Sequence, residues 1–185
     1  MRIFLITMAA LVVASNTFAM EVGGVKLDDK ANVGGQDLVL NGAGIRSRVI
    51  FKVYVGSLYV PAKAPDLAAV LAKGPRRIQL NILRNLTADQ LIDALVEGLK
   101  ENTTVDELAA IKPQTAELVA TMKAFNDVKE KDVVTLDFVD GATKIGLNGA
   151  AKGSIAGEPF NRALTSVWLG DHPAQADLKK AMLGG

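Results

Sequence analysis

Hydrophobic and polar positions alternate along much of the first half of the chain and again between residues 132 and 155. One set of alternate positions is wholly apolar (49, 51, 53 and 55), and the other set (48, 50, 52, 54 and 58) mixes two cations and a tyrosine with aliphatic residues. A period of two in a segment rich in Val, Ile, Phe and Tyr is typical of a β-strand whose two faces have different surroundings. Strands are therefore predicted over 36–46 and 49–60, and they can fold back on one another around Ser47-Arg48.

Shorter strands are predicted in five further segments, at 20–27, 77–83, 132–139, 143–147 and 152–155. Asp140-Gly141 and Asn148-Gly149 separate the last three of them, and both dipeptides favour the left-handed backbone of a two-residue hairpin. Residues 28–35 are polar and glycine-rich, so a loop is predicted there.

The apolar period changes from 2 to 3.6 residues in the middle of the chain and near its end. Thr87 with Gln90, and Thr104 with Glu107, have the spacing of capping boxes at two helix N-termini. Pro113 stops or kinks the second of these helices. Helices are predicted over 66–72, from residue 87, from residue 104, and over 114–125, 158–169 and 173–183. Their apolar stripes are assigned to core packing.

The order of these elements predicts the fold class. Strands come first, then helices, a hairpin, and helices again, without the regular strand–helix alternation of a doubly wound sheet. The prediction is an α+β fold in which an open-faced antiparallel sheet is covered on one face by a layer of helices. The chain has 185 residues and 49% hydrophobic content, enough for one globular domain with its own core, and this domain is assigned to residues 20–185.

The first residues have the pattern of a secretory signal peptide. Arg2 precedes an apolar run over 3–13, and small residues at Thr17 and Ala19 suit a cleavage site. The apolar run is too short for an ordinary transmembrane helix, which needs about 20 residues. We therefore expect residues 1–19 to be removed and the mature protein to be periplasmic or secreted, without a membrane span; an uncleaved N-terminal anchor is the alternative.

Charge and composition exclude several function classes. Removing residues 1–19 leaves 20 basic and 20 acidic residues, without the basic excess that nucleic-acid binding requires. The absence of cysteine excludes disulfides, thiolate nucleophiles and cysteine metal sites. The single histidine, His172, cannot build a multi-histidine zinc site, and no Gly-x-Ser-x-Gly motif supports a serine triad through it. No metal and no cofactor are predicted.

Two blocks of sequence resemble the chalcone isomerase superfamily, specifically its bacterial chalcone-isomerase-like branch. The N-terminal block is Asn41-Gly42-Ala43-Gly44-Ile45-Arg46, followed by Phe51-Lys52-Val53-Tyr54 and Leu58-Tyr59. The C-terminal block is Ala163-Leu164, Val167-Trp168-Leu169-Gly170-Asp171 and Leu178-Lys179-Lys180-Ala181-Met182-Leu183-Gly184. The resemblance implies an open-faced β-sandwich with a helical layer over a large antiparallel sheet.

Arg46 is the leading candidate for a functional residue. Its guanidinium stays charged and presents a planar fork that matches a carboxylate. The resemblance implies two roles for such an arginine: holding a chalcone for ring closure, or pairing with a tyrosine to a lipid carboxylate. Tyr54 is the first choice for that tyrosine and Tyr59 the second. Arg46 and Tyr54 would lie about 26 Å apart in one straight strand, so they can share a ligand only if the chain turns back between them. A surface arginine with solvent-facing ion pairs is the alternative.

The other catalytic side chains that the resemblance implies for an isomerase are missing from this sequence. At the start of the first long helix, where the resemblance implies a catalytic tyrosine, the chain has Leu86. The implied asparagine falls at Asp93 or Ala94, and the implied hydroxyl residue falls at Val167. Without these groups the attack of a phenolate would lack acid–base and positioning partners.

We therefore predict an exported, non-catalytic and monomeric protein that binds a fatty acid or a similar amphiphilic anion between sheet and helices. Two alternatives remain: an isomerase acting on a chalcone-like or other enone substrate, and a structural or interaction protein whose core is filled. Leu, Val and Met at a helix–sheet interface fit both a pocket and a solid core.

Overall fold

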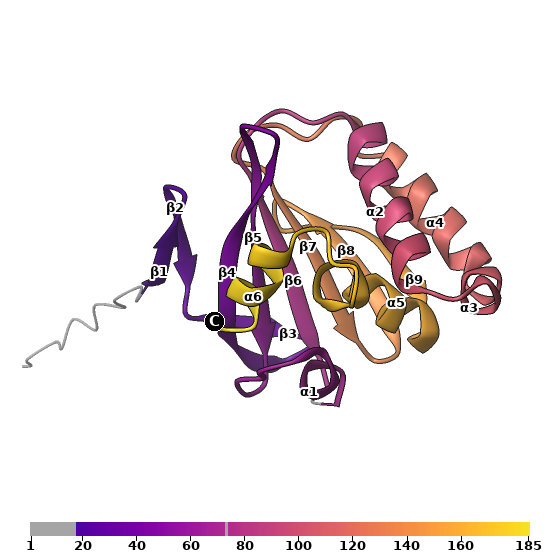
Figure 1. Ribbon diagram of the computed structural model, residues 1–185, viewed down its shortest axis with the longest axis horizontal. Coiled ribbons are helices and arrows are strands. Elements are labelled where there is room, and N and C mark those ends of the chain that lie inside the picture. Colours follow the sequence, from indigo (N-terminus) through magenta and orange to yellow (C-terminus); the bar gives the residue numbers. More distant parts are fainter. Residues whose placement is uncertain (1–17, 73) are drawn as a thin grey trace, which may run out of the picture.

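The computed structural model describes residues 18–72 and 74–185, so the predicted signal peptide lies outside the described residues except for Phe18 and Ala19. Within the described part a seven-stranded antiparallel sheet has the order β3-β4-β5-β6-β7-β8-β9, and β1 and β2 form a separate hairpin (Figure 1). The strands are β1 (Phe18–Val22), β2 (Val25–Asp28), β3 (Lys30–Val33), β4 (Gln36–Arg48), β5 (Phe51–Val60), β6 (Arg76–Ile82), β7 (Val133–Val139), β8 (Ala142–Leu147) and β9 (Ala150–Ala156). The predicted antiparallel α+β architecture is confirmed.

Tight turns connect most neighbouring strands. The two predicted hairpin dipeptides, Asp140-Gly141 and Asn148-Gly149, both have positive φ at each residue, as a type I′ turn requires. Gly23-Gly24 and Gly34-Gly35 form two more turns of this kind, and neither was predicted. The predicted single strand over 20–27 is therefore a hairpin, and the predicted loop over 28–35 contains β3.

Six helices complete the described part of the chain: α1 (Leu67–Ala72), α2 (Ala88–Asn102), α3 (Val105–Ala110), α4 (Lys112–Lys123), α5 (Glu158–Leu169) and α6 (Ala176–Met182). Both predicted capping boxes are confirmed. The side chains of Thr87 and Thr104 accept from the backbone amides of Gln90 and Glu107, and the backbone N–H groups of the two threonines donate to the side chains of the same two residues. Within the described residues, no helix is long and apolar enough to cross a bilayer.

The main core lies between one face of the sheet and the helical layer. Figure 1 shows α2, α4, α5 and α6 on the same side of the curled sheet. Buried side chains from both layers meet there, with Trp168 and Phe160 of α5 and Leu99 of α2 packing against sheet residues such as Ile78 and Leu136. Burial of these large apolar groups is the dominant stabilising term of the fold.

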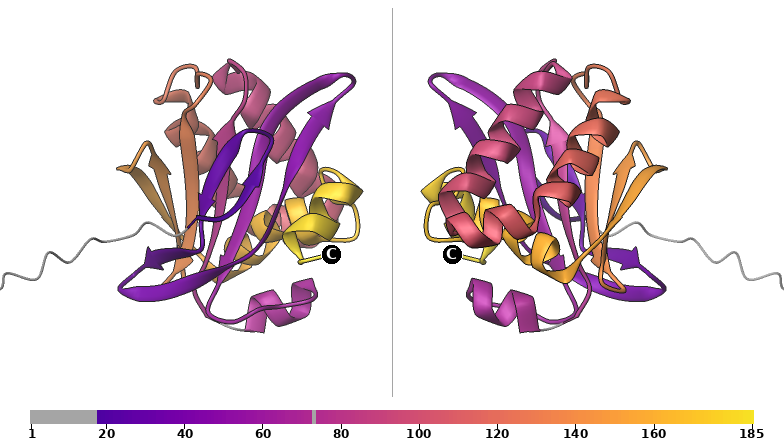
Figure 2. Two further views of the ribbon diagram at one scale, coloured as in Figure 1. Left: turned by 90° about the vertical axis from the view of Figure 1, so that its left-hand side faces the viewer. Right: turned by 90° about the vertical axis from the view of Figure 1, so that its right-hand side faces the viewer.

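A smaller core occupies the opposite face of the sheet, near β4 and β5. Leu27 of β2 packs there with Leu38, Val55 and Tyr59. The Tyr59 hydroxyl donates to the backbone carbonyl of Asp28 at 3.2 Å, which attaches this face to the β1–β2 segment. Among the described residues no helix covers the rest of this face (Figure 2).

The glycines of β4 allow α6 to pack directly on the sheet. A Cβ at Gly42 would overlap the carbonyl oxygen of Ala181, and one at Gly44 would come within 2.8 Å of the Ala181 Cβ. Neither glycine has positive φ, so close approach of α6 explains them and a special backbone conformation does not.

One arginine is buried in the helix–sheet interface without an acidic partner. Arg76 is 3% exposed, and no described acidic residue forms an ion pair with it. Its Nε donates to Thr165 Oγ1 at 2.9 Å, its Nη2 donates to Asn161 Oδ1 at 2.5 Å, and its guanidinium lies 4.7 Å from the ring centre of Phe138. Burial lowers the pKa of Arg76 to about 10, so the charged side chain depends on these neutral acceptors.

Candidate ligand-binding site

A cavity of about 470 Å³ lies between the sheet and the helical layer. Its walls come from the outer half of the β4–β5 hairpin, from β6 to β8, from α2 and the end of α4, and from the C-terminal turn of α5. Most of the lining side chains are apolar: Val49, Phe51, Val53, Leu80, Leu86, Leu91, Ala94, Leu95, Met122, Phe125, Val134, Leu136, Ile145 and Val167. The interface between sheet and helices is therefore hollow at this point, which the filled-core alternative did not anticipate.

The β4–β5 hairpin brings Arg46 and Tyr54 together. They are directly paired across the two strands, so both side chains project from the same face, and both line the cavity. The chain turns at Val49-Ile50, two residues beyond the predicted reversal. Because the chain turns back between them, Arg46 and Tyr54 are close enough to contact the same ligand.

A β-bulge at Val53 changes which residues of β5 face the cavity. Opposite the step from Arg46 to Ser47, the pairing moves from Tyr54 directly to Lys52, which leaves Val53 without a partner on β4. The predicted apolar face is split by this bulge, because Val53 lines the cavity while Val55 packs in the smaller core on the other side. The bulge thus lets Val53 and Tyr54, which are adjacent in sequence, contribute to the same cavity.

Trp168 fixes the Tyr54 hydroxyl. The indole Nε1 donates to the Tyr54 oxygen at 3.0 Å, and both side chains are buried. Burial raises the pKa of Tyr54, although the Trp168 hydrogen bond and the nearby Arg46 charge act in the opposite direction. Tyr54 is therefore a neutral phenol at neutral pH. Since its oxygen already accepts from Trp168, its own proton can be donated to another group.

Further charged side chains surround the cavity. Arg48 and Arg84 line it beside Arg46, and the Arg84 guanidinium lies 4.6 Å from the ring centre of Phe51. Glu97 and Glu101 line it from α2. None of these three arginines forms an ion pair with a described acidic residue. Three guanidinium groups thus line the cavity without an ion pair among the described residues, and two carboxylates line it from α2.

The other predicted site residue lies elsewhere. Tyr59 is on the opposite face of the sheet, where its ring packs in the smaller core and its hydroxyl bonds to Asp28. Burial raises the pKa of Tyr59 as well. It does not line the cavity, and we do not include it in the proposed site. The cause is strand parity: Tyr54 and Tyr59 are separated by five residues, so on a regular strand they point to opposite faces.

Comparison with known proteins identifies the family. The family model described as chalcone isomerase-like matches residues 19–184. The chain belongs to the chalcone isomerase-like family. Among solved structures, the fatty-acid binding protein of Arabidopsis thaliana has the same fold, with a TM-score of 0.65 and 14% sequence identity over 86% of this chain and 92% of that chain. No curated protein matches the sequence.

The positions that the isomerase role requires are apolar in this member of the chalcone isomerase-like family. Leu86 and Val167, where the resemblance implied a tyrosine and a hydroxyl residue, both line the cavity. Of the two positions considered for the asparagine, Ala94 lines the cavity and Asp93 is exposed on α2 outside it. The cavity wall therefore offers no hydroxyl group at these places to deliver or receive a proton.

Two lining residues were not singled out from the sequence. Trp168 lies four residues after Leu164 on the apolar stripe of α5, so its position alone predicts core packing. The available signal was chemical, since a buried indole N–H usually finds an acceptor. Arg84 follows β6 without any motif, and only the fold places it beside Phe51.

Proposed function

We propose that this protein binds a fatty acid or a similar amphiphilic anion in the cavity, with Arg46 as the anchor of the head group, and that it catalyses no reaction on it. The observation that supports this most directly is the pairing of Arg46 and Tyr54 at the edge of an apolar hollow. The cavity has the size and the mainly apolar lining of small-molecule sites in proteins.

The head group is recognised by charge and hydrogen bonding. A carboxylate can accept from the Arg46 guanidinium and from the Tyr54 hydroxyl together, because Trp168 leaves the phenol proton available. Tyr54 stays neutral because burial raises its pKa, so it remains a donor. No described acidic residue forms an ion pair with Arg46.

The hydrophobic effect favours binding of the hydrocarbon tail, because the tail leaves water and is buried in the cavity. Each methylene group buried against Leu, Val and Met side chains contributes about 0.8 kcal/mol. A tail of several methylenes therefore contributes more than the head group, while Arg46 and Tyr54 determine its orientation. The fatty-acid binding protein of Arabidopsis thaliana, which has the same fold, is consistent with this proposal.

We further propose that the protein acts outside the cytoplasm. The basic, apolar and small-residue pattern of residues 1–19 supports export with removal of that segment. Edman sequencing or mass spectrometry of the protein from its own host tests this, because a mature chain that begins at Met20 is expected. An intact Met1 in cells would contradict it.

Native mass spectrometry of the protein purified from its own host tests the binding function. An adduct with the mass of an acyl chain is expected on the wild type and is expected to be lost or strongly reduced in Arg46→Gln. Arg162→Gln is the matched control, since Arg162 is an exposed arginine of α5 outside the cavity, and it should retain the adduct.

Two results would contradict the proposal. The first is the absence of any adduct from a wild-type protein that is folded and freshly purified. The second is turnover of chalcones or small enones, which would support the isomerase alternative.

A further inference from the structure

The tip of the β4–β5 hairpin has an unusual composition for a turn. Val49 and Ile50 are its two central residues, and they are 91% and 83% exposed. Phe51, the next residue, is 53% exposed. These are three of the five large hydrophobic residues that are exposed in the described part of the chain, and they are consecutive. Soluble proteins rarely concentrate exposed apolar residues in this way without an interaction partner.

Turn chemistry does not explain these residues. Val49 has a φ of 57°, a left-handed conformation in which a β-branched side chain is strained. The other tight two-residue turns of the sheet have Gly-Gly, Asp-Gly or Asn-Gly at this place. The chain thus uses favourable turn residues elsewhere, whereas here it has an exposed apolar pair whose first residue, Val49, is unfavourable in its backbone conformation. A role in binding explains the exception better than a role in folding.

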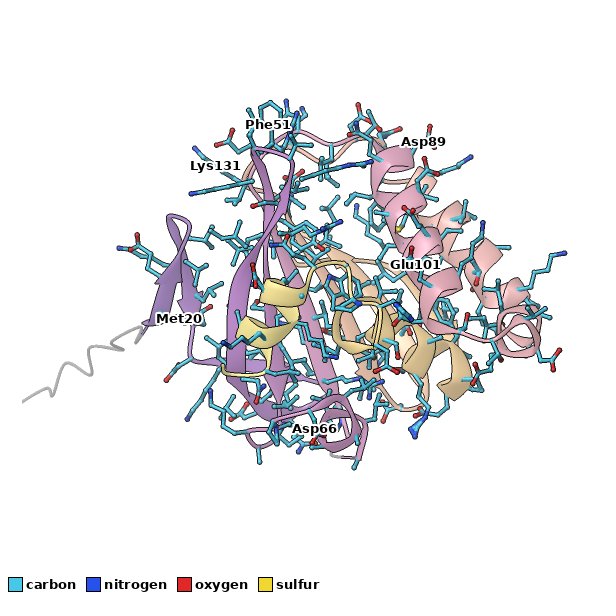
Figure 3. The ribbon with its side chains drawn as sticks, viewed as in Figure 1. Met20, Phe51, Asp66, Asp89, Glu101 and Lys131 are labelled. Carbon is cyan, nitrogen blue, oxygen red and sulfur yellow. The ribbon has the colours of Figure 1, made fainter. Side chains whose placement is uncertain are left out.

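The charge of the hairpin indicates the kind of partner. The segment from Arg46 to Lys52 contains three basic residues and no acid. Arg84 lies against Phe51 from the neighbouring connection. Figure 3 shows Lys131 and Phe51 at the same end of the molecule, with Asp89 there as well. An apolar tip whose own hairpin carries three basic residues and no acid matches the interface of an anionic lipid bilayer, where apolar groups enter the acyl boundary and cations stay among the head groups.

We propose that the tip, residues 49–51, docks the protein on anionic lipid bilayers. Figure 2 shows the hairpin projecting from the body of the molecule, so the tip can reach a flat surface. Val49 and Phe51 also line the cavity, which places its rim at the docked surface. The proposal goes beyond ligand binding, and it depends on the composition and position of the tip and not on what the cavity holds.

Vesicle flotation tests the proposal. The wild type is expected to float with vesicles of phosphatidylcholine containing about a third phosphatidylglycerol, much less with pure phosphatidylcholine, and less as salt is raised. Val49→Gly with Ile50→Ser gives a favourable turn dipeptide without apolar side chains. This double variant should unfold at a higher urea concentration than the wild type, and its vesicle affinity should fall at least about tenfold.

Two further variants separate charge from hydrophobicity. Lys52 and Lys131 are exposed and do not line the cavity. Lys52→Gln with Lys131→Gln should weaken binding to anionic vesicles by roughly twentyfold and leave the binding of a fatty acid unchanged. Val105→Asn removes another highly exposed valine, on α3, and should leave flotation unchanged.

Three outcomes would overturn the proposal. In the first, the folded wild type does not float with anionic vesicles at low salt. In the second, Val49→Gly with Ile50→Ser floats like the wild type. In the third, the wild type forms a dimer that this double variant loses, without vesicle binding by either, which would assign the tip to a contact between two copies of the chain. None of these outcomes depends on whether an acyl ligand co-purifies, so failure of this proposal and failure of the binding function are distinguishable.

Discussion

The protein fixes the side chain of Tyr54 more firmly than the side chain of Arg46. Tyr54 is buried and its hydroxyl is fixed by Trp168, whereas Arg46 is half-buried and has no acidic partner among the described residues. A preorganised hydroxyl beside an unpaired cation is a suitable arrangement for an anionic ligand, since binding then costs little ordering of the phenol. At this scale the site is defined by three side chains from β4, β5 and α5.

Tyr54→Phe should weaken the binding of a fatty acid by roughly tenfold to a hundredfold, because a hydrogen bond to a charged group contributes about 1.5–3 kcal/mol. It also leaves the Trp168 N–H without its acceptor, so the fluorescence of this only tryptophan should change in the unliganded protein. Titration with a fluorescent fatty acid measures the affinity. An unchanged dissociation constant would contradict the role of the phenol.

Asn161→Ala should destabilise the fold by about 2–4 kcal/mol, because it leaves the buried charge of Arg76 without its closest acceptor. Urea unfolding at neutral pH measures this. Thr165→Ser is the control, since it keeps a hydroxyl for the Arg76 Nε and should cost much less. A loss of stability no larger than about 0.5 kcal/mol for Asn161→Ala would show that the guanidinium finds other partners.

The β4–β5 hairpin is the element on which the site depends. Its pairing places Arg46 opposite Tyr54, and its bulge gives both Val53 and Tyr54 access to the cavity. The glycines of β4 then let α6 lie directly on the strand. One long hairpin thus holds Arg46 and Tyr54, the proposed head-group residues, at its middle and presents the exposed tip at its end.

Gly42→Ala should destabilise the protein by more than about 2 kcal/mol, because the new methyl group would overlap the Ala181 carbonyl of α6. Gly24→Ala is the matched control. At Gly24 a Cβ meets nothing within 4 Å, but the φ of 83° is left-handed, so the cost should be only about 1–2 kcal/mol from the backbone. Equal losses of unfolding free energy for the two variants would contradict close packing of α6 on β4.

The elements with a local signal could be predicted from the sequence, and those without one could not. A few adjacent residues determine each capping box and each two-residue hairpin turn, so these elements can be recognised in the sequence. They are the capping boxes at Thr87 and Thr104 and the turns at Asp140-Gly141 and Asn148-Gly149. The Val49-Ile50 turn and the bulge at Val53 have no such residues and are imposed by pairing with neighbouring strands. This is why Arg46 and Tyr54 were recognised as candidates, while the faces of β5 were assigned incorrectly.

At the scale of the whole molecule, the two faces of the sheet pack against different elements. One face supports the helical layer and encloses the cavity, and the other has a small core completed by the β1–β2 hairpin. The cavity extends toward the end of the molecule where the hairpin tip is exposed. The fold therefore combines a mainly apolar cavity, arginines in its lining and an exposed apolar tip in one region.

The ionisation state of a bound fatty acid tests the central claim most directly. With a carboxyl carbon-13 label, the chemical shift of the bound head group reports its charge as the pH is lowered from neutral to about 4. Pairing with Arg46 favours the carboxylate, so the label should remain ionised across this range in the wild type and become protonated within it in Arg46→Gln. If the label titrates in the same way in both proteins, Arg46 does not anchor the head group.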